Sequence, residues 1–237
     1  MFDIPMDLRS LEGAILRYEQ EPIQKGLIMF YGHSLFTRWG SGVWAQQVRP
    51  MAQDICMKDG SLAVVNHGFG TSTTEERLYY YDRLVRPWEP RALVLANWGN
   101  DSMYGYSPEQ SMHATAQLLA WARADFPGIK LFLVDMHPTA KAKRDVEIRP
   151  GVALPDKWNN KLREREKIRE MLMIYAQTHE DTTFINLWDK PEFFEEGHVG
   201  DFHYVRDELF MEDMVHPNQA GYDILGPIFR EALDELL

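Results

Sequence analysis

The stretch Gly26-Leu27-Ile28-Met29-Phe30-Tyr31-Gly32-His33-Ser34 decides the fold class, because an apolar run leads directly into a Gly-His-Ser turn. The run predicts a buried strand over 26–31, since parallel strands covered on both faces have this composition. Ligands of an open α/β sheet bind at the carboxyl ends of its strands. Ser34 is therefore placed where a substrate would bind, and we consider it a candidate nucleophile.

Four more short apolar runs follow, separated by segments with helical character. The expected strands cover 62–66, 92–96, 131–134 and 183–187, and the expected helices cover 11–18, 39–51, 74–85, 156–178 and 217–237, with a further helix starting at 107–109. We expect a polar loop or lid over 140–155 and an irregular segment over 192–210. The alternation predicts an α/β fold with a five-stranded parallel sheet covered on both faces. We expect a single domain over 1–237, with 1–25 as an N-terminal extension packed on it.

Composition limits the partners that this protein can have. The formal charge of −11 over 237 residues argues against nucleic acid or an anionic membrane. A lone cysteine, Cys56, excludes an intrachain disulfide and a cysteine-built zinc site. The N-terminal residues lack a basic region followed by an apolar one, and no apolar run approaches ~18 residues, so we expect a cytoplasmic protein. Nothing in the sequence predicts an oligomeric state.

A base and its orienting group occur together near the C-terminus, in Asp213-Met214-Val215-His216-Pro217-Asn218. A serine becomes a good nucleophile when a neighbouring base removes its proton and a third group orients that base. His216 is the candidate base for Ser34, and Asp213 can fold back on its Nδ1 atom. Each of these residues alone would be read as a turn or cap residue. Their joint occurrence favours a hydrolase-type site.

Candidate donors for an oxyanion follow two other predicted strands. Gly99-Asn100-Asp101 places an amide side chain, that of Asn100, after the third strand, and the turn over 68–71 can offer backbone N–H groups. Together with the serine and its base, these donors describe acyl transfer to water.

Four sequence blocks, taken in order, resemble the SGNH (GDSL-type) hydrolase superfamily. The blocks are Gly-His-Ser at 32–34, Asn-His-Gly-Phe-Gly-Thr at 66–71, Gly-Asn-Asp at 99–101 and Asp-Met-Val-His-Pro-Asn at 213–218. The resemblance spans most of the chain and implies a flavodoxin-like, three-layer α/β/α fold and an ester hydrolase that needs neither metal nor cofactor. It is strongest for members of the platelet-activating-factor acetylhydrolase type and for bacterial carbohydrate acetylesterases.

By this resemblance Ser34 is the nucleophile and supplies one oxyanion N–H, Asn100 supplies a side-chain donor, and Asp213 and His216 complete the triad. Two positions depart from the family pattern. His33 stands where the family usually has aspartate, which puts the support of the turn in doubt. Thr71 stands where the oxyanion glycine is expected, one residue after Gly70, so both remain candidates for the second N–H. A β-branched residue there would narrow the acyl pocket and resist a positive φ.

Other motifs are weaker. The match Gly40-Ser41-Gly42-Val43-Trp44-Ala45 to a dinucleotide-binding fingerprint begins several residues beyond its strand, and no acidic residue ends the second strand. His137, His198 and His203 are interpreted as scattered surface histidines instead of metal ligands. Trp98 lies near a strand end and lines either the substrate pocket or the core, and His33 is a second candidate for the pocket.

The sequence therefore predicts a serine esterase that removes a short acyl group, such as acetyl, from a carbohydrate or another small metabolite. A lipid-directed acylhydrolase or thioesterase is the alternative within catalysis. A binding protein that has kept the fold and lost turnover is the alternative from another class.

Overall fold

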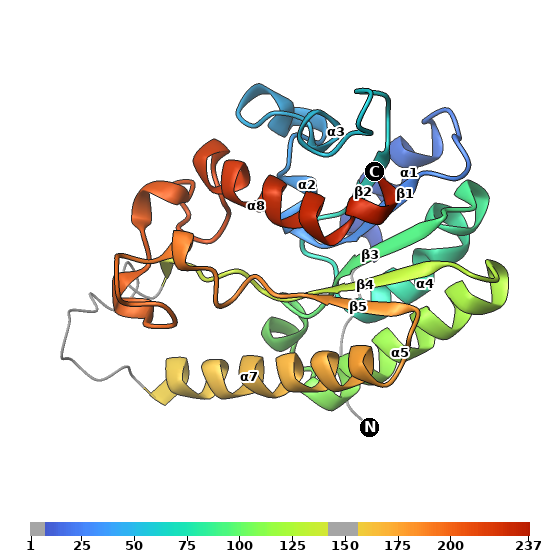
Figure 1. The fold of residues 1–237 in the computed structure, drawn as a ribbon. Coiled ribbons are helices and arrows are strands. Elements are labelled where there is room, and N and C mark those ends of the chain that lie inside the picture. The colour runs from blue at the N-terminus through green and yellow to red at the C-terminus, as the bar shows by residue number, and fades with distance from the viewer. Residues whose placement is uncertain (1–7, 142–155) are drawn as a thin grey trace.

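The computed structural model describes residues 8–141 and 156–237 (Figure 1). The strands are β1 (Ile28–Gly32), β2 (Val64–Gly68), β3 (Ala92–Ala96), β4 (Lys130–Val134) and β5 (Thr182–Ile185). The α-helices are α1 (Leu8–Glu19), α2 (Ser34–Thr37), α3 (Met51–Asp54), α4 (Thr74–Leu84), α5 (Pro108–Asp125), α7 (Asp156–Gln177) and α8 (Gln219–Ala232). Short 3₁₀ helices include η1 (Gly42–Gln46) and η3 (Asp101–Tyr104), and three more lie between β5 and α8, where an irregular segment was expected.

All five strands are parallel, in the order β2-β1-β3-β4-β5. This is the flavodoxin-like order. The chain adds β2 on one side of β1 and then returns to add β3 on the other side, so the direction of strand addition reverses at this point. The carboxyl ends are level with each other, because Gly32 pairs with both Gly68 and Ala96. The predicted α/β fold is confirmed, and the level ends bring the polar residues after β1, β2 and β3 to one edge.

The central strands β1 and β3 are buried on both faces, as their composition predicts. On β1, Ile28 and Phe30 pack into one apolar core while Met29 and Tyr31 pack into the other. This alternation is the two-residue period of a strand. Helices α2, α3 and α8 cover the first face, and α1, α4, α5 and α7 cover the second (Figure 1).

The two longest predicted helices on the second face begin where expected. Ser107 caps α5 by accepting a hydrogen bond from the backbone N–H of Gln110, and Pro108 takes the first helical position. Helix α7 buries Ile168 and Leu172 in the apolar core on the second face.

The loop expected over 140–155 lies outside the described residues except for 140–141, and the first seven residues of the N-terminal extension lie outside them too. Its helix α1 buries Leu11, Ile15 and Tyr18 in the core.

The helix predicted over 39–51 is wrong. Over 39–51 the structure instead contains the 3₁₀ helix η1 and only the first residue of α3, and Gly40 and Gly42 interrupt the segment at φ of +64° and +56°. The apolar spacing that suggested one helix has another origin, because Trp39 is fully buried and packs on Tyr222 of α8 with ring centroids 4.9 Å apart. Tertiary packing thus overrides the local pattern.

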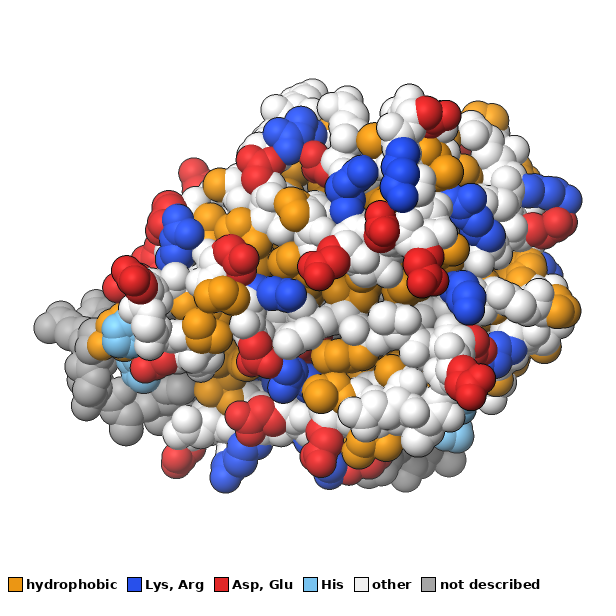
Figure 2. All heavy atoms as spheres, in the orientation of Figure 1, with side chains coloured by type: hydrophobic (Ala, Val, Ile, Leu, Met, Phe, Trp, Pro, Cys, Tyr) orange, Lys and Arg blue, Asp and Glu red, His pale blue; other side chains and the backbone are white. Residues whose placement is uncertain are grey.

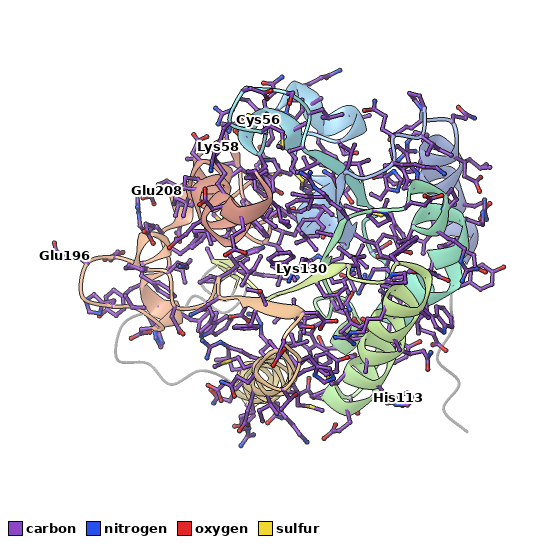
Figure 3. All side chains as sticks on the ribbon, turned by 45° about the vertical axis from the view of Figure 1, so that its right-hand side comes forward. Cys56, Lys58, His113, Lys130, Glu196 and Glu208 are labelled. Atoms are coloured by element: carbon purple, nitrogen blue, oxygen red, sulfur yellow. The ribbon has the colours of Figure 1, made fainter. Side chains whose placement is uncertain are left out.

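The single cysteine, Cys56, lies in the segment between α3 and β2. Figure 3 shows it close to Lys58 and far from His113 on α5. Within 8–141 and 156–237, no helix is both long enough and apolar enough to cross a bilayer.

We expect Gly40→Ala to cost about 3 kcal/mol of unfolding free energy, because it combines a positive φ with a severe clash. A Cβ at Gly40 would lie 2.4 Å from the carbonyl oxygen of Arg49. Gly42→Ala is the matched control, since a Cβ there meets nothing within 4 Å and only the positive φ remains. It should cost about 1 kcal/mol. Urea denaturation of both variants measures the difference, and equal losses would contradict the packing argument.

Candidate active site

The turn after β1 is held by His33, which caps helix α2. Its Nδ1 accepts the backbone N–H of Leu35 at 3.2 Å. Burial, followed by the positive charge of Arg77, holds the pKa of His33 well below its usual value, so Nδ1 stays free to accept. The imidazole thus supports the turn where the family usually has aspartate, and Ser34 becomes the first residue of α2.

Ser34, His216 and Asp213 form a continuous series of hydrogen bonds. His216 Nε2 lies 2.7 Å from Ser34 Oγ, and His216 Nδ1 lies 2.7 Å from Asp213 Oδ2. The other carboxylate oxygen, Oδ1, accepts the backbone N–H groups of Val215 and His216, both at 2.9 Å. Met214 adopts a φ of +58°, which tightens the turn between the acid and the base. The three predicted side chains therefore meet, although Ser34 and His216 are 182 residues apart in the sequence.

The ionisation states suit proton transfer from the serine. Burial lowers the pKa of His216 below its usual value, although its hydrogen bond to Asp213 works in the opposite direction. Burial tends to raise the pKa of Asp213, but the hydrogen bonds from His216 and Val215 prevail and bring it to about 2. Near neutral pH the carboxylate is charged and the imidazole is free to accept a proton.

The backbone N–H groups of Ser34 and of neighbouring Gly70 are the candidate oxyanion donors. Within the described residues, the structure gives no acceptor for the backbone N–H of Ser34 or of Gly70. Gly70 lies against the serine, since a Cβ built on it would be 3.7 Å from that of Ser34. Thr71 is exposed at φ +65°, and its hydroxyl donates to the carbonyl of Gly70 at 2.6 Å. Thr71 thus adopts a positive φ although its β-branched side chain disfavours it, and the contact with Ser34 favours Gly70 as the donor.

Asn100 joins the same edge through two contacts. Trp98 and Gly99 turn the chain after β3 with φ of +79° and +39°, and Gly99 packs so closely on His33 that a Cβ would lie 3.0 Å from its Nε2. The Asn100 amide donates one hydrogen to the carbonyl of Ser72 at 3.0 Å. Its second hydrogen is bonded to no described residue and remains available to a ligand.

Behind these donors lies a buried polar network that sequence reasoning missed. Arg77 is fully buried and donates to the carbonyl of Ser72 at 2.8 Å and to Asn97 Oδ1 at 2.9 Å. Its charge faces buried Asp101, with Nη2 3.7 Å from Oδ2, and Asp101 also accepts the N–H of Thr74 at 2.9 Å. The Gly-Asn-Asp motif contains Asp101, but nothing in the sequence pattern marks Arg77. The network fixes the Ser72 carbonyl to which Asn100 is bound.

We expect Asp101→Asn to lower the unfolding free energy by about 3 kcal/mol, because it leaves the buried Arg77 guanidinium without its counter-charge. The control is Asp82→Asn on the same helix as Arg77, where the carboxylate pairs with exposed Arg86. This control should lose less than about 0.5 kcal/mol. Chemical denaturation compares the two, and similar small losses would show that the buried pair is dispensable.

Trp98 is 1% exposed and borders a cavity of about 230 Å³ at the carboxyl ends of β3 and β4. The cavity wall also includes Asp135, whose Oδ2 accepts Arg169 Nε at 3.0 Å, and Trp188. Trp98 therefore lies in the core and lines a cavity at the same time.

The three histidines interpreted as surface residues differ in burial. His137 is only 7% exposed, so that interpretation is wrong for it. Its Nδ1 lies 2.7 Å from the carbonyl oxygen of Pro138, and burial lowers its pKa to about 4. In the part of the chain that the structure describes, no group of three or more His, Cys, Asp or Glu side chains is arranged to hold a metal ion.

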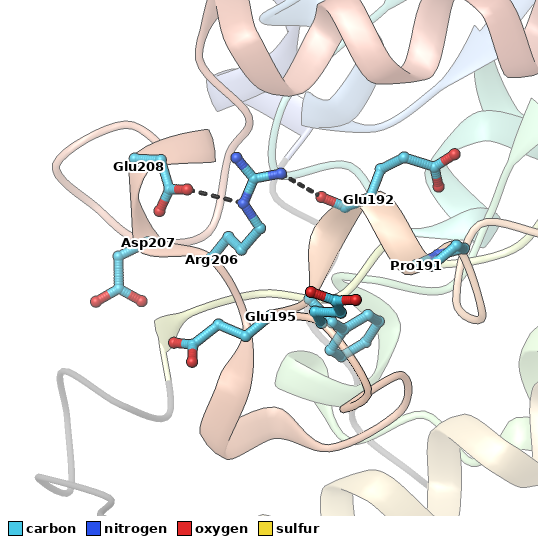
Figure 4. A pocket seen from close by; sticks show the side chains of 8 residues that line it. Pro191, Glu192, Glu195, Arg206, Asp207 and Glu208 are labelled. Atoms are coloured by element: carbon cyan, nitrogen blue, oxygen red, sulfur yellow. Dashed lines mark hydrogen bonds and ion pairs between the residues drawn. The ribbon is translucent and has the colours of Figure 1, made fainter.

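A wider, open hollow lies in the segment between β5 and α8 and is separate from the Ser34 site (Figure 4). Arg206 crosses it, donating to Glu208 Oε1 at 2.8 Å and to the carbonyl of Glu192 at 3.0 Å. The remaining rim is mainly acidic, and none of Ser34, Asp213 or His216 lines it.

The sequence matches the family model of the GDSL-like lipase/acylhydrolase family over residues 30–224. The match covers most of the chain and contains all four sequence blocks. The protein belongs to this family and is a hydrolase that acts on esters. No curated protein matches the sequence significantly.

Solved structures share the fold at low sequence identity. A GDSL-like lipase from Bacteroides thetaiotaomicron superimposes with a TM-score of 0.66 at 18% identity, covering 96% of this chain and 98% of its own. A Streptococcus pneumonia protein provisionally named a platelet activating factor gives 0.69 at 16% identity, with coverage of 95% and 94%. An Axe2 variant, an acetyl-xylooligosaccharide esterase from Geobacillus stearmophilus, gives 0.60 at 14% identity, with coverage of 89% and 95%. The predicted superfamily resemblance is confirmed.

Proposed function

We propose that this protein is a serine esterase that removes a short acyl group, such as acetyl, from a carbohydrate or another small metabolite. The observation that carries the proposal is the hydrogen-bonded series Ser34–His216–Asp213, next to backbone N–H groups that have no acceptor among the described residues.

In this mechanism Ser34 Oγ attacks the ester carbonyl carbon while His216 Nε2 takes its proton. Asp213 orients the imidazole and stabilises the imidazolium that forms. The N–H groups of Ser34 and Gly70 and the amide of Asn100 donate to the oxyanion, and one such donor typically contributes about 3 kcal/mol.

Collapse of the tetrahedral intermediate breaks the bond to the alcohol, which leaves with the proton held by His216. Water then attacks the acyl-enzyme with the same base, releasing the carboxylic acid and restoring the serine. No metal or cofactor takes part in either half.

A small acyl group and a polar alcohol are supported by the residues around the serine. His33 directly precedes the serine in the chain, and Thr71 directly follows Gly70, which lies against the serine, so both neighbouring side chains are polar. Tyr104, 41% exposed and four residues after Asn100, offers a ring face on which a sugar could stack. The fold is shared with an acetyl-xylooligosaccharide esterase, which agrees with this choice.

The partner and compartment remain those predicted from the sequence: a small-molecule ester in the cytoplasm, without nucleic acid or membrane. On the face seen in Figure 2, acidic and basic side chains are interspersed and form no broad basic area. This distribution supports a small-molecule partner.

Ser34→Ala should abolish hydrolysis of p-nitrophenyl acetate and covalent labelling by a fluorophosphonate, because both need the Oγ nucleophile. Ser61→Ala is the control, since this serine is exposed and, among the described residues, its hydroxyl bonds only to Asp59. Circular dichroism shows whether each variant is folded. Labelling that persists in Ser34→Ala would refute the nucleophile assignment, and an unlabelled, inactive wild type would favour a binding protein.

Acyl preference is tested with p-nitrophenyl acetate, butyrate and octanoate. We expect kcat/KM to fall as the chain lengthens, because the chain neighbours of Ser34 and Gly70, His33 and Thr71, are polar. Acetate release from an acetylated oligosaccharide then tests the alcohol part. A higher kcat/KM for octanoate, or rapid cleavage of an acyl thioester, would instead support the lipid-directed acylhydrolase or thioesterase.

A further inference from the structure

Arg38 contacts the acid of the proposed triad directly. Its Nη1 lies 2.9 Å from Asp213 Oδ2, the same oxygen that accepts the hydrogen of His216 Nδ1 at 2.7 Å. This one carboxylate oxygen therefore accepts hydrogen bonds from both the guanidinium and the imidazole. The triad motifs do not include this arginine, although it lies only four residues after Ser34.

The arginine is held in place from several sides. Its backbone N–H donates to the carbonyl of Ser34 at 2.9 Å, so both residues belong to one helical turn. Its guanidinium carbon lies 4.2 Å from the ring centroid of Trp44, and Nη1 is 3.4 Å from Met211 Sδ. The side chains of Arg38 and Asp213 are 23% and 33% exposed, so water screens their attraction only in part.

We propose that Arg38 is a positioning residue, whose guanidinium fixes the Asp213 carboxylate against His216 and draws part of its negative charge away from the imidazole. The inference rests on the proposed function, because it assigns His216 as the base that activates Ser34. The role of Arg38 does not depend on which ester is the substrate, since Arg38 contacts Asp213 and acts through it.

Several titratable or charged groups face His216 from the elements around it. Burial lowers the pKa of His216 most, Asp213 raises it, and Arg38 at the C-cap of α2 and Lys141 after β4 lower it further. The neighbouring rings of His33 and His137 have their own pKa values lowered by burial, so both are neutral near pH 7.

Loss of the Arg38 charge should therefore make His216 easier to protonate. The imidazolium becomes more stable and the pKa of His216 rises, by about half a unit for a partly screened charge at this range. Because only the neutral imidazole can accept the serine proton, the acid limb of the kcat/KM profile moves to higher pH by the same amount.

The test compares Arg38→Gln, which keeps a polar side chain without charge, with Arg38→Lys, which keeps the charge. NMR titration of the His216 ring, assigned with His216→Asn, follows protonation whether or not any ester is cleaved. We expect a rise of about half a pH unit in Arg38→Gln and a value close to wild type in Arg38→Lys. Arg49→Gln is the matched control, since Arg49 pairs with Asp54 and Asp223 instead of with the triad.

Activity supplies the second readout. In Arg38→Gln the plateau kcat should fall about tenfold with KM unchanged, because a misoriented base affects the reaction more than binding. Arg38→Lys should recover most of the lost kcat, and Arg49→Gln should match wild type.

Superimposed titration curves for wild type and Arg38→Gln would overturn the inference, as would a uniform loss of activity at all pH values that lysine does not rescue. Failure of Ser34 labelling would instead refute the proposed function, leaving the His216 titration to decide the role of Arg38.

Discussion

The position of Ser34 depends on how closely the backbone of helix α2 approaches the sheet. A Cβ on Gly68 would lie 2.5 Å from the backbone nitrogen of Thr37, and one on Gly32 would lie 3.0 Å from Cδ2 of Phe36 in α2. Only glycine allows this approach. Asn66 secures it, because its amide donates to the carbonyl of Phe36 at 2.7 Å and its oxygen accepts the N–H of Gly68 at 3.0 Å. Because Ser34 is the first residue of this fixed helix, its position at the edge of the sheet is fixed as well.

The groups that face the serine come from separate loops, and each loop is fixed by its own polar contacts. The Asp213–His216 turn is pinned because Met211 donates to the carbonyl of His216 at 2.8 Å, and Asn218 caps α8 immediately after it. The loops after β2 and β3 are joined through the Ser72 carbonyl, which accepts hydrogen bonds from both Arg77 and Asn100. A site of this kind is preorganised, so donors need not reorient when charge develops on a substrate.

Local signals were sufficient for most elements. Strands β1 to β5 were visible as short apolar runs because both faces of a central parallel strand are buried. Helix α5 was visible from its Ser-Pro start. The helix predicted over 39–51 does not form. Trp39 is apolar because it packs on α8, and Gly40 and Gly42 interrupt the segment with positive φ angles. Thr71 also adopts a positive φ that its own side chain disfavours, which the residue type does not predict.

By itself, the sequence determined the fold class, the family and the side chains of the candidate triad, because ordered motifs follow strands whose composition shows their burial. Only the tertiary structure showed that His33 caps the helix that begins at Ser34, that Gly70 lies against Ser34, and that Arg38 shares Asp213 with His216. It also revealed the Arg77–Asp101 pair behind the donors. These facts depend on side-chain directions and distances between residues far apart in the chain, and spacing along a sequence contains neither.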